Sequence, residues 1–550
     1  MIKRFLNSQT KTIAGSAGIL AISALLSRFL GLIRDRLLAG HFGAGEELDI
    51  YFASFQVPDL IYNVLFTGSI VVSFLPLFSE YYLKDKEEGW RMTNQILNVF
   101  IFLLGAISLA FFFLMPWIVK WLVPGFSPAN QAEVIFLSRI MFLSPFFLGL
   151  SSIFSGVLQY FNRFLVYAAA PILYNLGIIL GILFLAPSLG ILGVAAGVVL
   201  GAFGHMIIQV PAAISCGFNY RFLLDFNYPA VKRIFVLAVP RTIAAATSQI
   251  NFIIITMIAS TLAAGSLAIF NFSNNLRYFP IGLIGISLAT ASFPSLSKNW
   301  AGNRKQDFIS GFSSIFRQIL FWIIPVSILL YVLRAQFIRI ILGTGEFGWL
   351  ETRLTAACLG IYCFGIFSQA LIPMILRAFF SLQDTKTPTV IAVASIFLNI
   401  ILSLSFVNLL SFPNRLADFV KMILKLEDIE NIAVVGLPLA FTLAMFFQFI
   451  FLLIFLYKKI GDFEIKKITN SFVKILIAGI LMVPVAYAFL YFSASFLDTK
   501  TFWGIFLQAT IAGTLGMLAY LFISFFLKSS ELATAQASIY REFKERFIDK

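Results

Sequence analysis

Long apolar stretches separated by short polar segments dominate the pattern of this sequence. Each stretch holds about 20 or more mostly apolar residues, the length that an α-helix needs to cross a membrane. The pattern predicts fourteen such helices, with the ranges 12–38, 48–81, 92–119, 131–160, 164–186, 190–215, 229–262, 265–297, 309–334, 352–381, 387–410, 433–457, 468–494 and 502–527. No stretch alternates polar and apolar residues as the strands of an outer-membrane barrel do. The sequence therefore predicts an all-α polytopic membrane protein, because hydrocarbon leaves open backbone groups without partners.

Lysines and arginines are distributed unequally among the predicted loops. With the N-terminus inside, the inner loops and termini hold 24 of these residues and the outer loops hold 8. Because positively charged loops stay on the cytoplasmic side, this split predicts that both termini are cytoplasmic. The stretch 411–432, which mixes charges of both signs, is expected as an outer loop with room for a short surface helix.

The chain also resembles itself. One offset of 218 residues relates three pairs at equivalent places in helices of matching rank: Pro76 with Pro294, Ser79 with Ser297, and Leu158 with Leu376. This predicts two parallel six-helix repeats, an arrangement that suits alternating access at the interface between them. We expect an N-terminal lobe at 1–216, a C-terminal lobe at 217–460, and a further pair of helices with a cytoplasmic tail at 461–550.

Composition narrows the choice of partners. Hydrophobic residues make up 60% of the 550 residues and charged residues 12%, and the net charge is +14. The basic residues are scattered through short loops instead of forming one face, which favours anionic membrane lipids over nucleic acid. The three cysteines and two histidines lack metal-ligand spacing, so we expect neither a metal site nor a cofactor.

Motifs of catalysis are missing from the sequence. It has no serine–histidine–acid set, no HExxH and no phosphate-cradling glycine-rich loop with a lysine. The sequence therefore predicts a protein that is not an enzyme and has no ATP motor of its own. Transport would have to be driven by the substrate gradient, an ion or the membrane potential.

The first predicted helix carries an unusual cluster of charge. Residues 27–36 read SRFLGLIRDR, with three arginines and one aspartate. A charge at the centre of a membrane helix costs about 2.5–3.5 kcal/mol, so these side chains need an aqueous or anionic environment. Arg28 and Asp35 share a helix face, and Gly31 leaves room beside them. We expect a cavity there; the alternative is that Arg34, Asp35 and Arg36 lie at the helix end and snorkel to the head groups.

Two further arginines in other predicted helices are candidates for the same cavity. Arg241 lies near the start of the seventh helix and Arg277 in the eighth. If these helices and the first two line the interface between the lobes, Arg28, Arg34, Arg241 and Arg277 face one cationic cavity. Guanidinium groups pair bidentately with phosphate, so such a cavity suits a phosphate-bearing substrate.

Other residues in the predicted helices are candidates for hinges or for a structural role. Asp49 either lines the cavity or simply begins the second helix, where a carboxylate complements the helix dipole. Arg317 is expected to snorkel at a cytoplasmic helix end. Glycines and prolines soften membrane helices, and the candidate hinge residues are Gly31, Pro58, Gly68, Pro280 and Gly282.

Several of these segments resemble the MurJ (MviN) family of lipid II flippases, within the multidrug, oligosaccharidyl-lipid and polysaccharide exporter superfamily. The matching segments are Ser27–Asp35, Phe42–Gly45 with Asp49, Pro58, Phe74–Pro76, Gln249–Asn251, Phe279–Pro280 with Gly282, Phe293–Ser297 and Arg377–Pro388. The resemblance implies fourteen helices in two lobes, with a terminal pair that forms a lipid-facing groove. By position it also implies that Arg28, Arg34, Asp35 and Asp49 line the family's cavity.

Two departures from the family pattern affect the expected head-group contacts. The family's arginines and Glu-Gly pair after the helix 2 proline are replaced by Tyr62, Asn63 and Thr67–Gly68. The family's arginine in the eighth helix is Asn275 here, and Arg277 follows two residues later. Two residues are about 200° on a helix, so Arg277 needs local adjustment to take over that role.

The resemblance and the residues together favour a lipid II flippase of the bacterial cytoplasmic membrane. In this hypothesis, a cationic central cavity moves the undecaprenyl-diphosphate-linked precursor from the inner to the outer leaflet by alternating access. Arg28 and Arg34 bind the diphosphate, Asp35 orients them, and Arg277 assists. A coupling monovalent cation and other cell-wall synthesis proteins are further candidate partners. The alternatives are an exporter of another polyprenyl-linked oligosaccharide or of a drug, and a non-transporting membrane scaffold for cell-wall synthesis.

Overall fold

The protein is helical throughout the part of the chain that the structure describes. A computed structural model describes residues 13–64, 71–534 and 536, and these ranges contain no β-strand. Eleven helices among them are long and apolar enough to cross a membrane. The all-α polytopic fold is thus confirmed. The count of fourteen spans stays a prediction, although every predicted range overlaps one or more helices.

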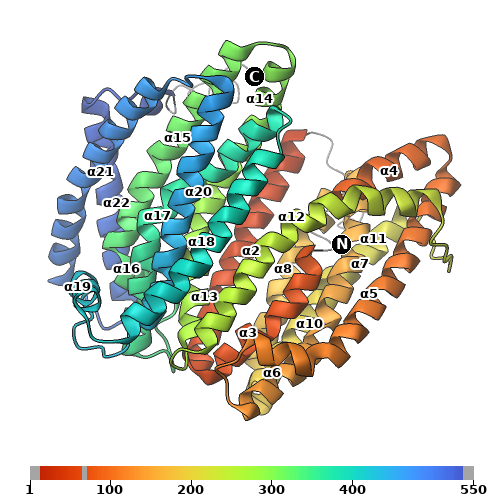
Figure 1. Cartoon of the computed structure of the whole chain (residues 1–550), viewed down its shortest axis with the longest axis horizontal. Coiled ribbons are helices and arrows are strands. Elements are labelled where there is room, and N and C mark those ends of the chain that lie inside the picture. Colours follow the sequence, from red (N-terminus) through yellow and green to blue (C-terminus); the bar gives the residue numbers. More distant parts are fainter. Residues whose placement is uncertain (1–12, 65–70, 535, 537–550) are drawn as a thin grey trace. The chain divides into compact units, whose positions relative to one another are not determined.

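The first of two compact units comprises residues 1–268 and 344–347. Its helices, most of which are labelled in Figure 1, are α2 (Ile13–Phe42), α3 (Glu46–Tyr62), α4 (Val71–Lys84), α5 (Lys86–Leu122), α6 (Pro128–Met141), α7 (Leu143–Tyr160), α8 (Phe164–Leu180), η2 (Gly181–Leu185), α9 (Ala186–Leu189), α10 (Ile191–Ile207), α11 (Gln209–Ser215) and α12 (Pro229–Ser260). Several predicted spans are interrupted. The predicted helix 131–160, for example, is two helices that meet at Phe142.

The second unit comprises residues 269–343 and 348–550, so that α13 (Ser266–Pro280) begins in the first unit. Its other elements are η3 (Ile281–Ile286), α14 (Ser287–Ala301), α15 (Lys305–Val332), α16 (Arg334–Ile341), α17 (Trp349–Ser381), α18 (Lys386–Ser411), α19 (Arg415–Leu424), η4 (Ala433–Val435), α20 (Gly436–Ile460), α21 (Ile465–Ala494) and α22 (Phe502–Phe526). The last two helices pack side by side (Figure 1). Large buried aromatic side chains fill this unit's core, among them Phe308, Phe312, Phe321, Tyr362, Phe379 and Tyr520.

Two helices of equal rank in the predicted repeats, α7 and α17, end in the same way. Asn162 and Gln383 both have left-handed backbone conformations, with φ of 57° and 56°. The next backbone N–H then donates to a carbonyl five residues earlier, from Arg163 to Leu158 at 2.8 Å and from Asp384 to Phe379 at 3.0 Å. These are Schellman-type endings. The two endings are 221 residues apart, three more than the offset of 218 that relates Leu158 and Leu376.

Prolines inside three helices leave carbonyl groups that side chains of neighbouring helices satisfy. A proline cannot donate to the carbonyl four residues earlier. The Ser54 carbonyl, freed by Pro58, accepts from Ser138 Oγ at 3.1 Å. The Phe112 carbonyl, freed by Pro116, accepts from Arg139 Nε at 3.1 Å, and the Phe321 carbonyl, freed by Pro325, accepts from Tyr520 Oη at 2.8 Å. Arg139, an intramembrane charge in the sequence, thus has a structural partner.

Arg317, which was expected to snorkel at a helix end, forms an ion pair with a residue that follows α22. Its Nη1 lies 2.5 Å from Glu531 Oε1 and 2.9 Å from Ser530 Oγ, and Glu531 is buried. The segment after α22 therefore folds back onto α15. The sequence did not indicate this ion pair, because the carboxylate that pairs with Arg317 is 214 residues away. Snorkelling of Arg317 stays a prediction.

Candidate functional site

The charged cluster of α2 is held from two directions. Arg34 donates from Nε and Nη2 to Asp35 Oδ1, at 3.1 and 2.8 Å, and from Nη1 to Asn175 Oδ1 of α8 at 3.3 Å. The Asp35 side chain is 5% exposed and that of Arg34 is 23% exposed. The carboxylate is therefore buried, while part of the guanidinium remains accessible. An arginine fixed in this way is preorganised to meet an anion on its open side.

Asn175 joins α8 to α2 through both ends of its amide. Its Nδ2 donates to Ser27 Oγ at 3.1 Å and to the Pro171 carbonyl at 3.2 Å, while its Oδ1 receives Arg34. An amide in a membrane helix that bonds across to a neighbour holds the two helices in register. Sequence reasoning missed Asn175, because a single asparagine in an apolar helix carries no pattern.

A glycine seam sets the position of α8. Gly177 of α8 and Gly181, which begins η2 directly after α8, face Gly201 and Gly197 of α10. A Cβ added at Gly181 would lie 2.6 Å from the Gly197 Cα. Such small residues let the backbones of membrane helices approach closely. The seam fixes α8 against α10, and through Asn175 it fixes the place of Arg34.

Asp59 of α3 is a second acidic neighbour of Arg34. It lies close enough to interact electrostatically with the guanidinium, and its side chain is exposed. Arg28, predicted to bind substrate, is half-buried on α2 in the same unit. Arg34 therefore has two acidic neighbours, Asp35 and Asp59.

Asp49 caps the start of α13. Its Oδ2 accepts from the Gly265 N–H at 2.7 Å and its Oδ1 from the Ala268 N–H at 2.8 Å, and the residue is 3% exposed. A carboxylate at a helix N-terminus is stabilised by the free N–H groups there. Asp49 therefore stabilises a helix N-terminus. The sequence suggested such a role at the start of its own helix, whereas the structure places it at the start of α13. A substrate contact for Asp49 stays a prediction.

Arg277 of α13 is buried in a box of amide oxygens and aromatic rings. Its Nη1 donates to Gln369 Oε1 at 2.5 Å and its Nη2 to Asn274 Oδ1 at 2.5 Å. Its guanidinium lies 4.2 Å from the Tyr362 ring centroid and 3.9 Å from that of Phe441. Among the side chains described, no carboxylate pairs with it, so amide dipoles and π-faces stabilise its charge. Gln369, Tyr362 and Phe441 were not found from the sequence.

The remaining predicted site residues fall into two groups. The side chain of Arg241, on α12, and all of Gly68 lie outside the described residues. Of the candidate hinges, Gly31 lies within an unbroken α2, Pro58 within α3, and Pro280 at the end of α13, directly before the π-helical turn η3 that contains Gly282. Pro58 and Pro280 thus coincide with irregular hydrogen bonding. Their movement stays a prediction.

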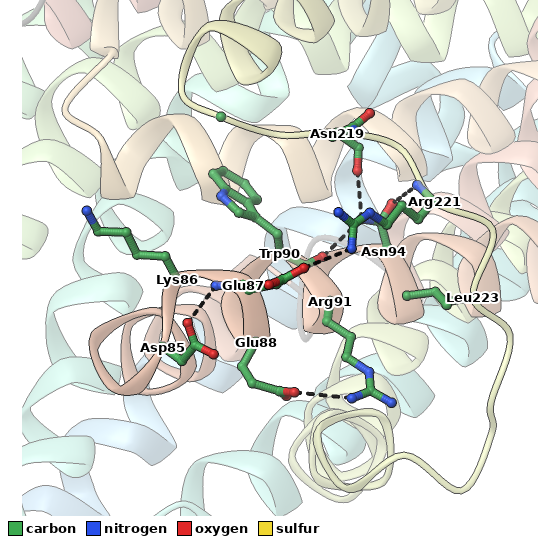
Figure 2. A pocket seen from close by; sticks show the side chains of 11 residues that line it. Asp85, Lys86, Glu87, Glu88, Trp90, Arg91, Asn94, Asn219, Arg221 and Leu223 are labelled. Carbon is green, nitrogen blue, oxygen red and sulfur yellow. Dashed lines mark hydrogen bonds and ion pairs between the residues drawn. The ribbon is translucent and has the colours of Figure 1, made fainter.

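A pocket of about 700 Å³ lies at the start of α5. Figure 2 shows Asn94 bonded to the segment that follows α11: its Nδ2 donates to the Asn219 carbonyl at 2.9 Å and its Oδ1 accepts from the Arg221 N–H at 2.9 Å. Arg221 also pairs with Glu87 at 3.0 Å. The charges lining the pocket largely neutralise one another. We assign it the structural role of holding the segment before α12.

The fold is shared with solved structures of membrane transporters. A structure described as the "Inward-facing conformation of a multidrug resistance MATE family transporter of the MOP superfamily" matches with a TM-score of 0.66 and 11% identity, over 81% of this chain and 99% of the other. A family model described as "Lipid II flippase MurJ" matches residues 38–413, which are more than half of the chain. The chain therefore belongs to the MurJ family and is a multi-pass transporter of the bacterial cytoplasmic membrane.

Individual relatives agree with this assignment. A structure described as "Lipid II flippase MurJ, inward closed conformation" matches with a TM-score of 0.73 and 25% identity, over 92% of this chain and 98% of the other. The "Probable lipid II flippase MurJ" of Vibrio cholerae is 28% identical over 409 residues, which are 72% of this chain and 78% of that protein.

Proposed function

We propose that this protein moves lipid II, the undecaprenyl-diphosphate-linked precursor of peptidoglycan, from the inner to the outer leaflet of the cytoplasmic membrane. The relatives that share its fold and family are described as lipid II flippases. The observation that carries the proposal is the partly accessible guanidinium of Arg34, held on α2 by Asp35 and by Asn175 of α8. The diphosphate of the substrate supplies the anion that such an arginine can bind.

Each residue has a distinct task in this mechanism. Arg34 and Arg28 bind the diphosphate, and Asp35 with Asn175 keeps the Arg34 guanidinium facing its ligand. Arg277 assists once its guanidinium leaves Gln369 and Asn274, and Arg241 adds positive charge. Because Asp59 interacts with Arg34, it competes with the diphosphate and favours release.

Transport proceeds by alternating access of the lobes at 1–216 and 217–460, with both termini in the cytoplasm. Bending at Gly31, Pro58, Gly68, Pro280 and Gly282 accompanies the movement, and the helices in 461–550 accommodate the polyprenyl tail. A monovalent cation or the membrane potential supplies the driving force, at about 2.3 kcal/mol per charge per 100 mV. Cell-wall synthesis proteins that use the product are candidate partners.

Complementation tests the proposal. Cells depleted of their own lipid II flippase receive the parent, Arg34→Ala, Arg34→Lys, Arg28→Ala or the control Arg221→Ala, whose side chain is exposed in an ion pair. Growth, membrane abundance and the fraction of lipid II accessible from outside the cell are measured. We expect rescue by the parent and the control, failure of both alanine variants, and partial rescue by lysine, which keeps the charge without the bidentate fork.

Two outcomes would contradict the proposal. Rescue by both alanine variants at normal abundance would remove the arginines from the mechanism and favour a scaffold. Failure of an abundant parent to expose lipid II would favour another polyprenyl-linked substrate.

A further inference from the structure

The connection between α18 and α20 contains a well-defined short helix, α19. Three residues separate it from the end of α18 at Ser411. Asn414 caps its start, because Oδ1 accepts from the Leu416 and Ala417 N–H groups, both at 2.9 Å. It ends at Lys425, which has a left-handed backbone with φ of 57°. The helix is therefore specified by its own sequence at both ends.

The side chains of α19 divide into two sectors. At about 100° per residue, Phe419, Ile423 and Leu416 point about 40°, 80° and 100° away from Arg415. Val420, Leu424 and Ala417 continue the same apolar sector to about 200°. Arg415, Asp418 and Lys421 lie in the remaining sector, together with Met422, which is 58% exposed beside Arg415. The helix is thus amphipathic, with an apolar face that covers nearly half of its circumference.

Within the described part of the chain, only half of that apolar face is buried. Ala417 and Leu424 are buried, at 2% and 7% exposed, whereas Leu416, Phe419 and Ile423 are 37%, 54% and 44% exposed. Burial of one flank and exposure of the adjacent flank place α19 at the edge of its unit. An apolar surface of this kind marks an interaction site.

The exposed flank continues an apolar surface that must face lipid. Along α18, a helix apolar enough to span the membrane, Ile401, Leu404 and Leu409 are each at least 47% exposed. Phe412, between α18 and α19, is 64% exposed. Because α19 begins three residues after this span ends, its apolar flank lies at the depth where hydrocarbon meets the head groups.

An ion pair and hydrogen bonds fix the part of the connection that follows α19. Arg353, in the first turns of α17, donates from Nη1 to Asp428 Oδ2 and from Nη2 to Asp428 Oδ1, both at 2.5 Å, and also to the Lys425 carbonyl. Lys421 Nζ donates to the Glu430 carbonyl at 3.1 Å. These contacts hold the residues after α19 against the unit, so that the exposed flank keeps one direction.

We infer that α19 is an interfacial helix whose Leu416, Phe419 and Ile423 insert into the phospholipid surface beyond the end of α18, while Arg415 and Asp418 face water. The partner is the lipid bilayer itself. An amphipathic helix with large apolar side chains on one face and charges on the other lies in the plane of the membrane in this way. With the orientation proposed above, the surface is that of the outer leaflet. The inference does not depend on which substrate is transported.

Photo-crosslinking in cells tests the inference on the full chain. Benzoylphenylalanine is introduced in place of Phe419, of Ile423 or, as the control from the opposite face, of Asp418, and illuminated protein is purified and analysed by mass spectrometry. We expect phospholipid adducts at positions 419 and 423, in about tenfold excess over position 418, since only the apolar face enters the acyl region.

Two results would overturn the inference. Protein adducts in place of lipid adducts at position 419 would mean that a protein covers the flank. Equal lipid adducts at positions 418 and 419, or none at either, would mean that the apolar face of the helix does not insert into the bilayer. All three positions are exposed, so the substitutions leave the packing intact, and trypsin resistance matching the parent checks this.

Discussion

The Tyr520 hydroxyl donates to the Phe321 carbonyl at 2.8 Å, one turn before Pro325. The proline at position 325 has no N–H for this carbonyl, so a side chain from α22 takes its place. Both partners are buried. The bond therefore connects α15, next to Pro325, to the C-terminal helix pair.

We expect Tyr520→Phe to lower the free energy of unfolding by about 1–3 kcal/mol, because it leaves a buried carbonyl unsatisfied. Denaturant titration in detergent measures the change. In the background of Pro325→Ala, the new backbone N–H reaches the Phe321 carbonyl, so the same substitution is expected to cost much less. Additive losses in this double-mutant cycle would contradict the coupling.

The glycine seam predicts that Gly197→Ala destabilises the first unit. A Cβ at this position would lie 2.8 Å from the Gly181 Cα, which is backbone and cannot rotate away. We expect a loss of about 1–3 kcal/mol in the free energy of unfolding, with reduced transport because α8 carries Asn175. Gly204→Ala is the matched control on α10, since its Cβ would meet only Leu173 Cβ at 3.8 Å. Similar melting temperatures for the two variants would count against the seam.

Removing the charge of Asp59 should tighten substrate binding. The carboxylate interacts with Arg34 and repels a diphosphate bound there. We expect Asp59→Asn to raise the affinity for an undecaprenyl diphosphate about three- to tenfold, equivalent to roughly 0.7–1.4 kcal/mol, and to slow turnover. Equilibrium binding to the purified protein in nanodiscs measures the affinity, with Glu87→Gln as a control. Weaker binding by Asp59→Asn would mean that the carboxylate positions Arg34 instead.

Asp384, in the turn after α17, should make stability depend on pH in the acid range. Partial burial raises its pKa, but the Lys459 ammonium at 2.7 Å and the Thr387 hydroxyl and N–H lower it further, to about 2 from the ordinary 3.8. The charged carboxylate therefore stabilises the fold above about pH 4, and this contribution is lost as the pH falls through 2.

The prediction is that Asp384→Asn unfolds at a lower denaturant concentration than the parent at pH 7, and that the difference shrinks between pH 4 and pH 2. Asp307→Asn serves as the control, because its distance to Arg304 is 3.9 Å and both side chains are more than half exposed. A difference that stays constant down to pH 2 would mean that Asp384 acts through hydrogen bonds alone.

The helices could be predicted from the sequence because each one needs about 20 apolar residues in a row. The same pattern could not locate the break at Phe142, where both sides are equally apolar. The charges of α2 also stood out, since arginine is rare in apolar segments. Their partners did not, because Asn175 is 141 residues from Arg34 and an isolated amide has no periodicity.

The partners of Arg277 could not be predicted from the sequence either. The sequence shows a charge in a polar stretch of α13, and a cavity was the natural prediction for it. Gln369, Tyr362 and Phe441 enclose it instead. Whether an arginine is open or enclosed depends on residues more than 80 positions away, which one-dimensional patterns do not report.

The segment at 344–347 belongs to the first unit although the chain on both sides of it belongs to the second. The Glu346 N–H bonds the Gly40 carbonyl at 3.0 Å, at the end of α2. During synthesis this end of α2 emerges about 300 residues before its partner does, which at roughly 5–20 residues per second is about 15–60 s. During this time the Gly40 carbonyl, near the end of the helix that carries Arg34, lacks its hydrogen bond from the Glu346 N–H. A gene divided at residue 268 would produce a first half that never receives this segment in its own chain.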